Sequence, residues 1–326
     1  MKVRSAALCI LTLCAASLSR AAGVVSSAVA RYPPGLLACP TTIDRIGRII
    51  APVMIDGTGP YPFLVDTGAN YSMISPVLAM RLNLHPRPDA LEKVVGITGT
   101  QRLPWVHVAN LRVGGLQMSN LDLPITKSPV MDGLDGILGL AALSAERIVV
   151  NFRDNLVWIG HTNEVDAWGY ISIPARRTTD GLLRVDARIG NVPVIAIIDT
   201  GSPRTMGNYA LQRVLLRRAT HGPDTARIFG VTRQVSWGSV SGSPTIHLGP
   251  VVIRHLNIVY DDLPIFKVWH LEYRPALVIG MDVLGTVDAL ILDYHRSHVY
   301  LMPRRPAGVE VIQADPFSLL HGGGGP

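Results

Sequence analysis

An internal repeat constrains the fold of this chain more strongly than any other feature of its sequence. In the first copy, a strand-like stretch, a glycine-containing turn and a second apolar stretch occupy residues 48–65 and lead into Asp66-Thr67-Gly68. The same order occupies residues 183–198 and leads into Asp199-Thr200-Gly201. A pattern that recurs in the same order indicates two structural units of one kind. We therefore expect a molecule with two similar lobes.

The remainder of each copy also follows one plan. About thirty residues after each Asp-Thr-Gly, a glycine-containing segment suited to a hairpin turn precedes an apolar stretch with a glycine and then a closing hairpin. These segments are 95–100, 136–140 and 148–159 in the first copy, and 229–232, 277–281 and 289–301 in the second. The short apolar stretches, together with 31 glycines and 24 prolines in 326 residues, predict an all-β fold.

The repeat also predicts domain boundaries. A chain of 326 residues, 48% of them hydrophobic, is long enough for about two domains. The apolar patch at 170–173, between the copies, can contribute a strand. The expected segments are a signal peptide (1–22), an N-terminal segment (23–42), a first lobe (43–162), a linker (163–181), a second lobe (182–303) and a disordered tail (304–326).

The first 22 residues have the features of a secretory signal peptide. A short basic region precedes an apolar run at 5–18, and small residues at 19–22 provide a cleavage site. An uncleaved anchor is the alternative, but the run is short for a bilayer span, so we expect no stable membrane insertion after cleavage. The leader and the excess of Arg over Lys favour export to a bacterial periplasm or medium. Residues 23–42 are then either a short propeptide or an ordered edge strand.

The two Asp-Thr-Gly tripeptides carry the candidate chemistry. One alone would say little, because Asp followed by Gly commonly forms a turn. Two at equivalent positions each end an apolar strand that delivers a carboxylate toward the interior, which is costly unless that carboxylate is paired. Two adjacent carboxylates share one proton, so one acts as a base and the other as an acid. Asp66 and Asp199 are therefore the candidate catalytic pair.

These motifs resemble those of the retropepsin-like aspartyl peptidases, in particular bacterial members with two peptidase units in one chain. Residues 63–70 and 197–202 are similar to the family's active-site motif, and Leu138-Gly139 and Ile279-Gly280 are similar to its apolar-apolar-glycine motif. The resemblance covers residues 43–303. It implies two pseudo-symmetric β-barrel lobes, arranged as in pepsin, with the active site in the cleft between them, and an aspartic endopeptidase activity.

The resemblance also implies roles for residues around the two carboxylates. Thr67 and Thr200 are expected to hydrogen-bond across the two active-site loops, while Gly68 and Gly201 allow a close backbone approach. Glycine-containing hairpins are expected to close over the substrate as flaps. The flap candidates are Gly96, Ile97, Thr98, Gly99, Gly230 and Val231.

Two positions depart from the family's pattern. Asp282 follows Gly280-Met281 as in many family members, but Ala141 stands at the matching place in the first repeat, so that lobe is expected to lose a structural contact. Pro203, in the second repeat, can alter the second active-site loop. Neither departure removes a candidate catalytic group.

The two active-site motifs differ in the residue that follows each glycine, which is Ala69 in the first and Ser202 in the second. A serine hydroxyl there can donate a hydrogen bond to the outer oxygen of Asp199, and such a bond favours the ionised carboxylate. The sequence therefore predicts that Asp199 carries the negative charge and Asp66 the shared proton.

Other classes of function find little support. The net charge of +6 is spread along the chain without an aromatic or glycine motif for nucleic acid, so none is expected as a partner. We expect no metal and no cofactor, because His295 and His298 are interpreted as surface residues and Cys39 as a passive thiol. A peptide or protein substrate and a monomer are expected. The alternative is a non-catalytic protein that keeps this fold and uses its cleft to hold a peptide or to regulate another protease.

Overall fold

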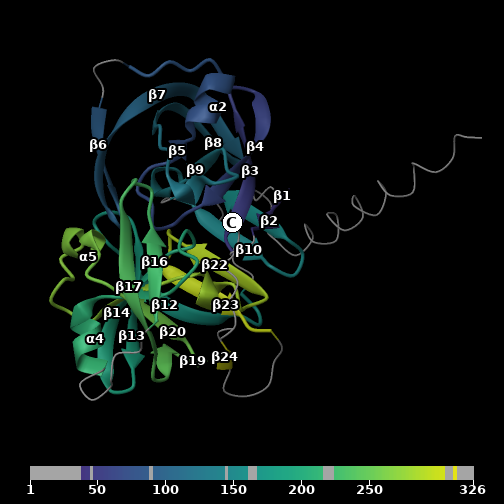
Figure 1. The fold of residues 1–326 in the computed structure, drawn as a ribbon. Coiled ribbons are helices and arrows are strands. Elements are labelled where there is room, and N and C mark those ends of the chain that lie inside the picture. Colours follow the sequence, from purple (N-terminus) through teal and green to yellow (C-terminus); the bar gives the residue numbers. More distant parts are fainter. Residues whose placement is uncertain are drawn as a thin grey trace, which may run out of the picture.

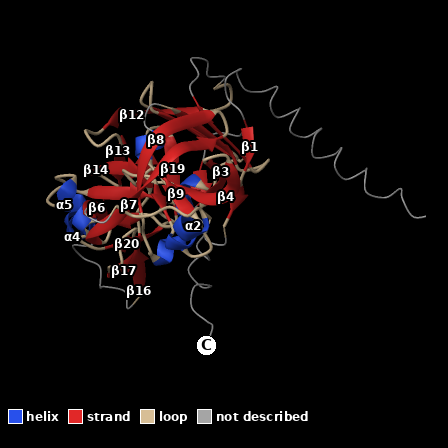
Figure 2. Cartoon of the chain, turned by 90° about the horizontal axis from the view of Figure 1, so that it is seen from above, coloured by secondary structure: helices blue, strands red, loops and turns tan. Residues whose placement is uncertain are grey.

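The computed structural model describes residues 38–44, 47–87, 91–143, 146–160, 167–215, 224–304 and 311–313. Its strands form two sheets, and Figure 2 shows these strands through the body of the molecule, with α4 (Tyr209–Leu215) and α5 (Pro264–Val268) at one edge. The predicted all-β class is confirmed. The predicted signal peptide lies outside the described residues. No helix in the described ranges has the length and apolar character needed to cross a membrane.

The first repeat builds an eight-stranded sheet in the order β5-β9-β4-β3-β7-β6, with β2 beside β3 and β8 beside β7 (Figure 1). Its strands are β2 (Thr42–Ile43), β3 (Ile49–Ile55), β4 (Thr58–Val65), β5 (Met73–Ile74), β6 (Leu91–Gly96), β7 (Gly99–Val113), β8 (Leu116–Pro124) and β9 (Gly136–Leu138). Its helical segments are α2 (Pro76–Arg81), the 3-10 turn η1 (Pro129–Met131) and α3 (Leu140–Leu143).

The second sheet has sixteen strands and contains the second repeat together with the closing hairpin of the first. Its strands are β1 (Ala38–Pro40), β10 (Arg147–Asn151), β11 (Leu156–Gly160), β12 (Ile171–Arg177), β13 (Leu183–Ile189), β14 (Val192–Ile198), β15 (Met206–Gly207), β16 (Thr225–Phe229), β17 (Val235–Gly242), β18 (Ile246–Leu248), β19 (Val251–Arg254), β20 (Asn257–Tyr260), β21 (Ala276–Ile279), β22 (Ala289–Asp293), β23 (His298–Met302) and β24 (Val311–Gln313). Its helices are α4 (Tyr209–Leu215), α5 (Pro264–Val268) and α6 (Met281–Leu284).

The resemblance implied β-barrel lobes, and the strands of the described residues form two sheets without a closed barrel. The reason is the pairing of the two closing hairpins. Strand β10 of the first repeat pairs antiparallel with β22 of the second, and all residues of both strands are buried. Backbone groups that would otherwise close each lobe on itself are therefore satisfied between the repeats. The resulting interlobe sheet, β1-β11-β10-β22-β23-β12, lies between the two lobes in Figure 1.

Three segments outside the predicted lobes also contribute strands. Strand β1 pairs with β11, so its residues form an edge strand. Strand β12, in the predicted linker, joins β23 to β13 and so connects the interlobe sheet to the second lobe. Within the segment predicted as a tail, residues 311–313 form β24, which pairs in parallel with β19. Two consecutive β-branched residues favour a strand there, and β19 would otherwise be an open edge.

Candidate active site

The two Asp-Thr-Gly turns lie at equivalent ends of the two repeats. Strand β4 ends in three fully buried residues and pairs in parallel with β9, and the amide N–H of Asp66 donates to the Leu138 carbonyl at 3.0 Å. Strand β14 pairs in the same way with β21, and the amide N–H of Asp199 donates to the Ile279 carbonyl at 3.0 Å. Buried parallel pairing therefore delivers both carboxyl groups to the same depth between the lobes.

The two threonines hydrogen-bond across the active-site loops. The amide N–H of Thr67 donates to the Thr200 hydroxyl at 3.2 Å, and that of Thr200 donates to the Thr67 hydroxyl at 3.0 Å. The hydroxyl groups in turn donate to strand ends in the opposite repeat, Thr67 to the Ile198 carbonyl at 3.1 Å and Thr200 to the Val65 carbonyl at 2.6 Å. Both threonines are fully buried. This crossed set of bonds holds the two loops in one relative position.

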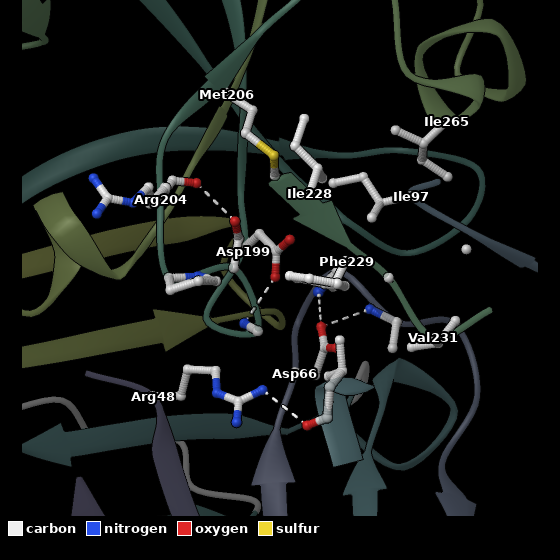
Figure 3. A pocket seen from close by; sticks show the side chains of 18 of the residues that line it. Arg48, Asp66, Ile97, Asp199, Arg204, Met206, Ile228, Phe229, Val231 and Ile265 are labelled. Carbon is white, nitrogen blue, oxygen red and sulfur yellow. Dashed lines mark hydrogen bonds between the residues drawn. The ribbon is translucent and has the colours of Figure 1, made fainter. Parts of the chain in front are cut away.

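The carboxyl groups of Asp66 and Asp199 lie next to each other between the loops (Figure 3). Each packs against the glycine of the opposite loop. A Cβ atom added to Gly68 would lie 2.5 Å from the carboxyl carbon of Asp199, and one added to Gly201 would lie 2.2 Å from that of Asp66. Neither distance is possible for real atoms, so only glycine allows the two carboxyl groups to approach this closely.

The surroundings of the two carboxyl groups are unequal. Burial raises the pKa of Asp66, but the amide N–H groups of Gly68 and Ala69, both at 2.9 Å, and the positive charge of Arg48 oppose that rise. Burial and then the adjacent charge of Asp66 raise the pKa of Asp199 well above its usual range. These directions favour the shared proton on Asp199 and the ionised form of Asp66. The sequence-based assignment of these charges was the reverse and is corrected.

The correction follows from the position of the Ser202 hydroxyl. It donates to the carbonyl of Arg204, two residues along the chain, at 2.7 Å, and not to Asp199. Pro203 lies between them and restricts the backbone of this turn, so the hydroxyl is directed away from the carboxyl group. The second loop keeps only backbone donors to Asp199, including the Gly201 amide N–H at 2.8 Å.

Asp282 supports the second active-site loop through Thr205. Its carboxylate accepts the amide N–H of Thr205 at 2.8 Å and the hydroxyl of Thr205 at 2.7 Å. Burial raises the pKa of Asp282 to about 6. In the first repeat Ser72 stands in place of Thr205 and accepts the Gly139 amide N–H at 3.1 Å, as Thr205 accepts that of Gly280 at 3.2 Å. Ala141 gives the first loop no equivalent of the Asp282 carboxylate.

The two flap candidates meet above the carboxyl pair. The first is the turn between β6 and β7, and the second is the loop between β16 and β17. Their tips join through a hydrogen bond between the hydroxyls of Thr98 and Thr232 at 3.2 Å. Gly96 faces Val231 and Thr232, Gly99 faces Gln234, and Gly230 faces Ile97 and Thr98, each without room for a Cβ atom. Residues lining the cleft from the flaps include Gly96, Ile97, Gly230 and Val231, of which Figure 3 labels Ile97 and Val231.

The second flap is also held by the first lobe, through residues that the sequence did not reveal. The hydroxyl of Thr126 donates to the Val231 carbonyl at 2.6 Å, and the hydroxyl of Ser128 donates to the Gly230 carbonyl. The cleft has a volume of about 220 Å³, below the roughly 300–1,000 Å³ of typical ligand pockets. The flap tips are joined to each other and the second flap to the first lobe, so we expect the flaps to separate when a peptide enters.

The two sides of the cleft differ in chemistry. In Figure 3 the apolar side chains Met206, Ile228 and Ile265 lie toward the Asp199 side, where Arg204 also lies, whereas Arg48 lies on the Asp66 side. Trp269 also lines the cleft. Sequence reasoning missed Arg48 and these four apolar residues. The only local signal was a lone charge directly before the buried strand β3. The others reach the cleft from β15, β16 and α5, which no short motif connects.

Comparison with known proteins gives a match to a family model described as aspartyl protease, over residues 51–142, which include Asp66. No curated protein matches the chain. Conglutin gamma, a basic 7S globulin from lupine seeds, has a TM-score of 0.44 and 13% identity, covering 82% of this chain and 95% of that chain. Basic 7S globulin from soybean has a TM-score of 0.43 and 13% identity over the same shares. The family match supports a peptidase-type function.

Proposed function

We propose that the protein is an aspartic endopeptidase in which Asp66 and Asp199 together hydrolyse a peptide bond. The observation that carries the proposal is the arrangement of these two buried carboxyl groups, each packed against the glycine of the opposite Asp-Thr-Gly loop. Burying two unpartnered carboxylates would be costly, and sharing one proton removes much of that cost. The match of residues 51–142 to the aspartyl protease family supports the same function.

The unequal charges assign a part of the reaction to each carboxyl group. Ionised Asp66 accepts a proton from a water molecule as the water oxygen attacks the scissile carbonyl carbon. Protonated Asp199 gives its proton to the carbonyl oxygen, which produces a tetrahedral diol. Asp66 then passes its proton to the leaving nitrogen while Asp199 recovers one from the diol, and the peptide bond breaks. The starting protonation state is restored.

The finer parts of the proposal concern the origin of the two halves. The family match lies within the first repeat, and the second repeat has its own Asp-Thr-Gly turn in the equivalent parallel strand pairing. We propose that both halves are peptidase units fused in one chain, with the flaps of both units closing over the substrate. Removal of residues 1–22 on export from a bacterial cell is part of the same proposal.

Binding of a transition-state analogue tests the function. A peptide analogue with a hydroxyl-bearing tetrahedral carbon should raise the melting temperature of the purified protein, because it binds only the folded state and resembles the diol. Asp66→Asn and Asp199→Asn should each lose most of this effect. If the wild type binds ordinary peptides at least as tightly as the analogue and cleaves none, it is a peptide-binding protein instead.

A further inference from the structure

Arg48 is a buried cation inside the proposed active-site cleft. Only 6% of the residue is exposed, although it lines the cleft on the Asp66 side. Its Nε donates to the Asp44 carboxylate at 2.7 Å and its Nη1 donates to the Val130 carbonyl at 3.0 Å. The hydrogen bonds that its guanidinium group makes to described residues use Nε and Nη1 and leave Nη2 available. The guanidinium group is thus fixed by two partners while donors remain for a third.

The second repeat shows that the fold does not need a cation at this place. Ile50 pairs with Leu64, and Arg184 pairs with Ile197, where Leu64 and Ile197 each lie two residues before the aspartate of their repeat. The residue equivalent to Arg48 is therefore Leu182, which is fully buried in the apolar core. A buried ion pair can often be replaced by apolar side chains without loss of stability. Packing alone therefore does not explain the positive charge of Arg48 in the first repeat.

The position of Arg48 suggests that reason. The remaining charged side chains along the cleft are Asp66, Asp199, Arg204 and Arg227, and with one shared proton the carboxyl pair holds a single negative charge. The Asp66 side therefore has a cation fixed by two protein partners, whereas Met206 and Ile228 lie toward Asp199 together with Arg204 (Figure 3). A guanidinium group with free N–H donors and restricted motion binds carboxylates strongly.

We propose that Arg48 determines substrate specificity, so that the cleft selects peptides with a glutamate or aspartate on the Asp66 side of the scissile bond. The inference rests on the proposed peptidase function. Asp44 holds the guanidinium in place, and the carboxylate of the substrate accepts from the donors that face the cleft. The ion pair with Asp44 is kept, so the substrate adds a second acceptor and replaces none.

Paired peptide substrates test this specificity. A peptide cleaved by the enzyme is made with Glu or Gln at each position on either side of the scissile bond, and kcat/KM is measured for each pair. At one position the wild type should prefer Glu by about tenfold or more, the effect of one charge-assisted hydrogen bond. The preference should decline below about pH 4.3, where a free glutamate becomes protonated. A merely structural role for Arg48 would produce neither effect.

Substitutions of Arg48 test whether this side chain causes the preference for Glu over Gln. Arg48→Leu, which copies the second repeat, should bring the Glu/Gln ratio close to one, and Arg48→Lys should keep part of it. Arg112→Leu is the matched control, because it removes the same charge from an exposed position outside the cleft and should leave the ratio unchanged. If Arg48→Leu does not fold, the Glu/Gln ratios of kcat/KM for the wild type and Arg48→Lys still test the role of Arg48.

The outcomes separate this inference from the proposed function. If peptides are cleaved but Glu and Gln are equivalent at every position, the specificity proposal is overturned and the peptidase proposal stands. A preference that survives in Arg48→Leu overturns the role of Arg48. Failure of the wild type to cleave any peptide or bind the transition-state analogue removes both proposals together.

Discussion

At the scale of single residues, the sequence predicts the pair Asp66 and Asp199 but not the division of charge between them. The pair is predictable because the tripeptide recurs at equivalent positions in a repeat. The division depends on where the Ser202 hydroxyl points and on a cation, Arg48, eighteen residues before Asp66. The direction of the Ser202 hydroxyl and the closeness of Arg48 to Asp66 both depend on how turns and strands pack in three dimensions. No local sequence pattern predicts either of them.

The pH profile of kcat/KM tests this division. Arg48→Met should move its acid limb to higher pH, because the cation lowers the pKa of Asp66, which must be ionised for activity. Ser202→Ala should leave the limb in place and cost about 1 kcal/mol of stability through the lost bond to Arg204. A shift in Ser202→Ala with none in Arg48→Met would restore the opposite assignment of charge.

Asp282 should make the stability of the protein depend on pH. Its pKa is about 6 in the folded protein and about 3.9 in an unfolded chain. Between these values the folded state binds more protons than the unfolded state at Asp282. The contribution of this residue to the stability of the wild type therefore falls as the pH rises from about 4 to about 6, and it is not regained above pH 6. The free energy of unfolding of Asp282→Asn, measured relative to that of the wild type, should therefore rise by about 3 kcal/mol between pH 4 and pH 7, the equivalent of roughly two pKa units.

Urea unfolding at pH 4 and pH 7 checks this gain, because ionisable groups common to both proteins cancel in the difference. Asp186→Asn is the control, since that side chain is 63% exposed and should change little between the two pH values. Parallel pH profiles for Asp282→Asn and the wild type would show that the buried carboxylate is not the source.

At the scale of elements, the sequence predicts which strands and hairpins form, but not all of their partners. The closing hairpins at 148–159 and 289–301 are predicted from short apolar runs and turn residues. Their pairing through β10 and β22 is not, because a register between residues that are more than a hundred positions apart leaves no local pattern. This pairing joins the two repeats, and the strands of the described residues form no closed barrel.

A buried ion pair joins the two repeats at this place. The Nη2 group of Arg147 in β10 lies 2.6 Å from a carboxylate oxygen of Asp293 in β22, and both side chains are almost fully buried. Asp293→Asn should destabilise the protein by about 3–5 kcal/mol, because it removes the charge opposite a buried guanidinium group. Asp288→Asn, which breaks the partly exposed pair with Arg153, should cost less than about 1 kcal/mol. Equal losses of stability in urea would contradict the buried role.

At the scale of the whole molecule, one chain supplies both halves of the site. The interlobe sheet and the crossed threonine bonds connect the repeats, and the second flap is bound by Thr126 and Ser128 of the first lobe. We therefore predict an active monomer, whose activity per molecule is constant on dilution. Loss of specific activity at low concentration, together with a change in sedimentation, would indicate that a second copy is required.

Cleavage of a complex peptide mixture by the purified protein, followed by mass spectrometry of the new termini, tests the central claim most directly. The wild type should produce defined new termini at mildly acidic pH, and Asp66→Asn and Asp199→Asn, checked for folding by circular dichroism, should each lose at least about a thousandfold in rate. The claim is contradicted if either folded variant retains substantial cleavage, or if the folded wild type produces no new termini at any pH between about 3 and 8.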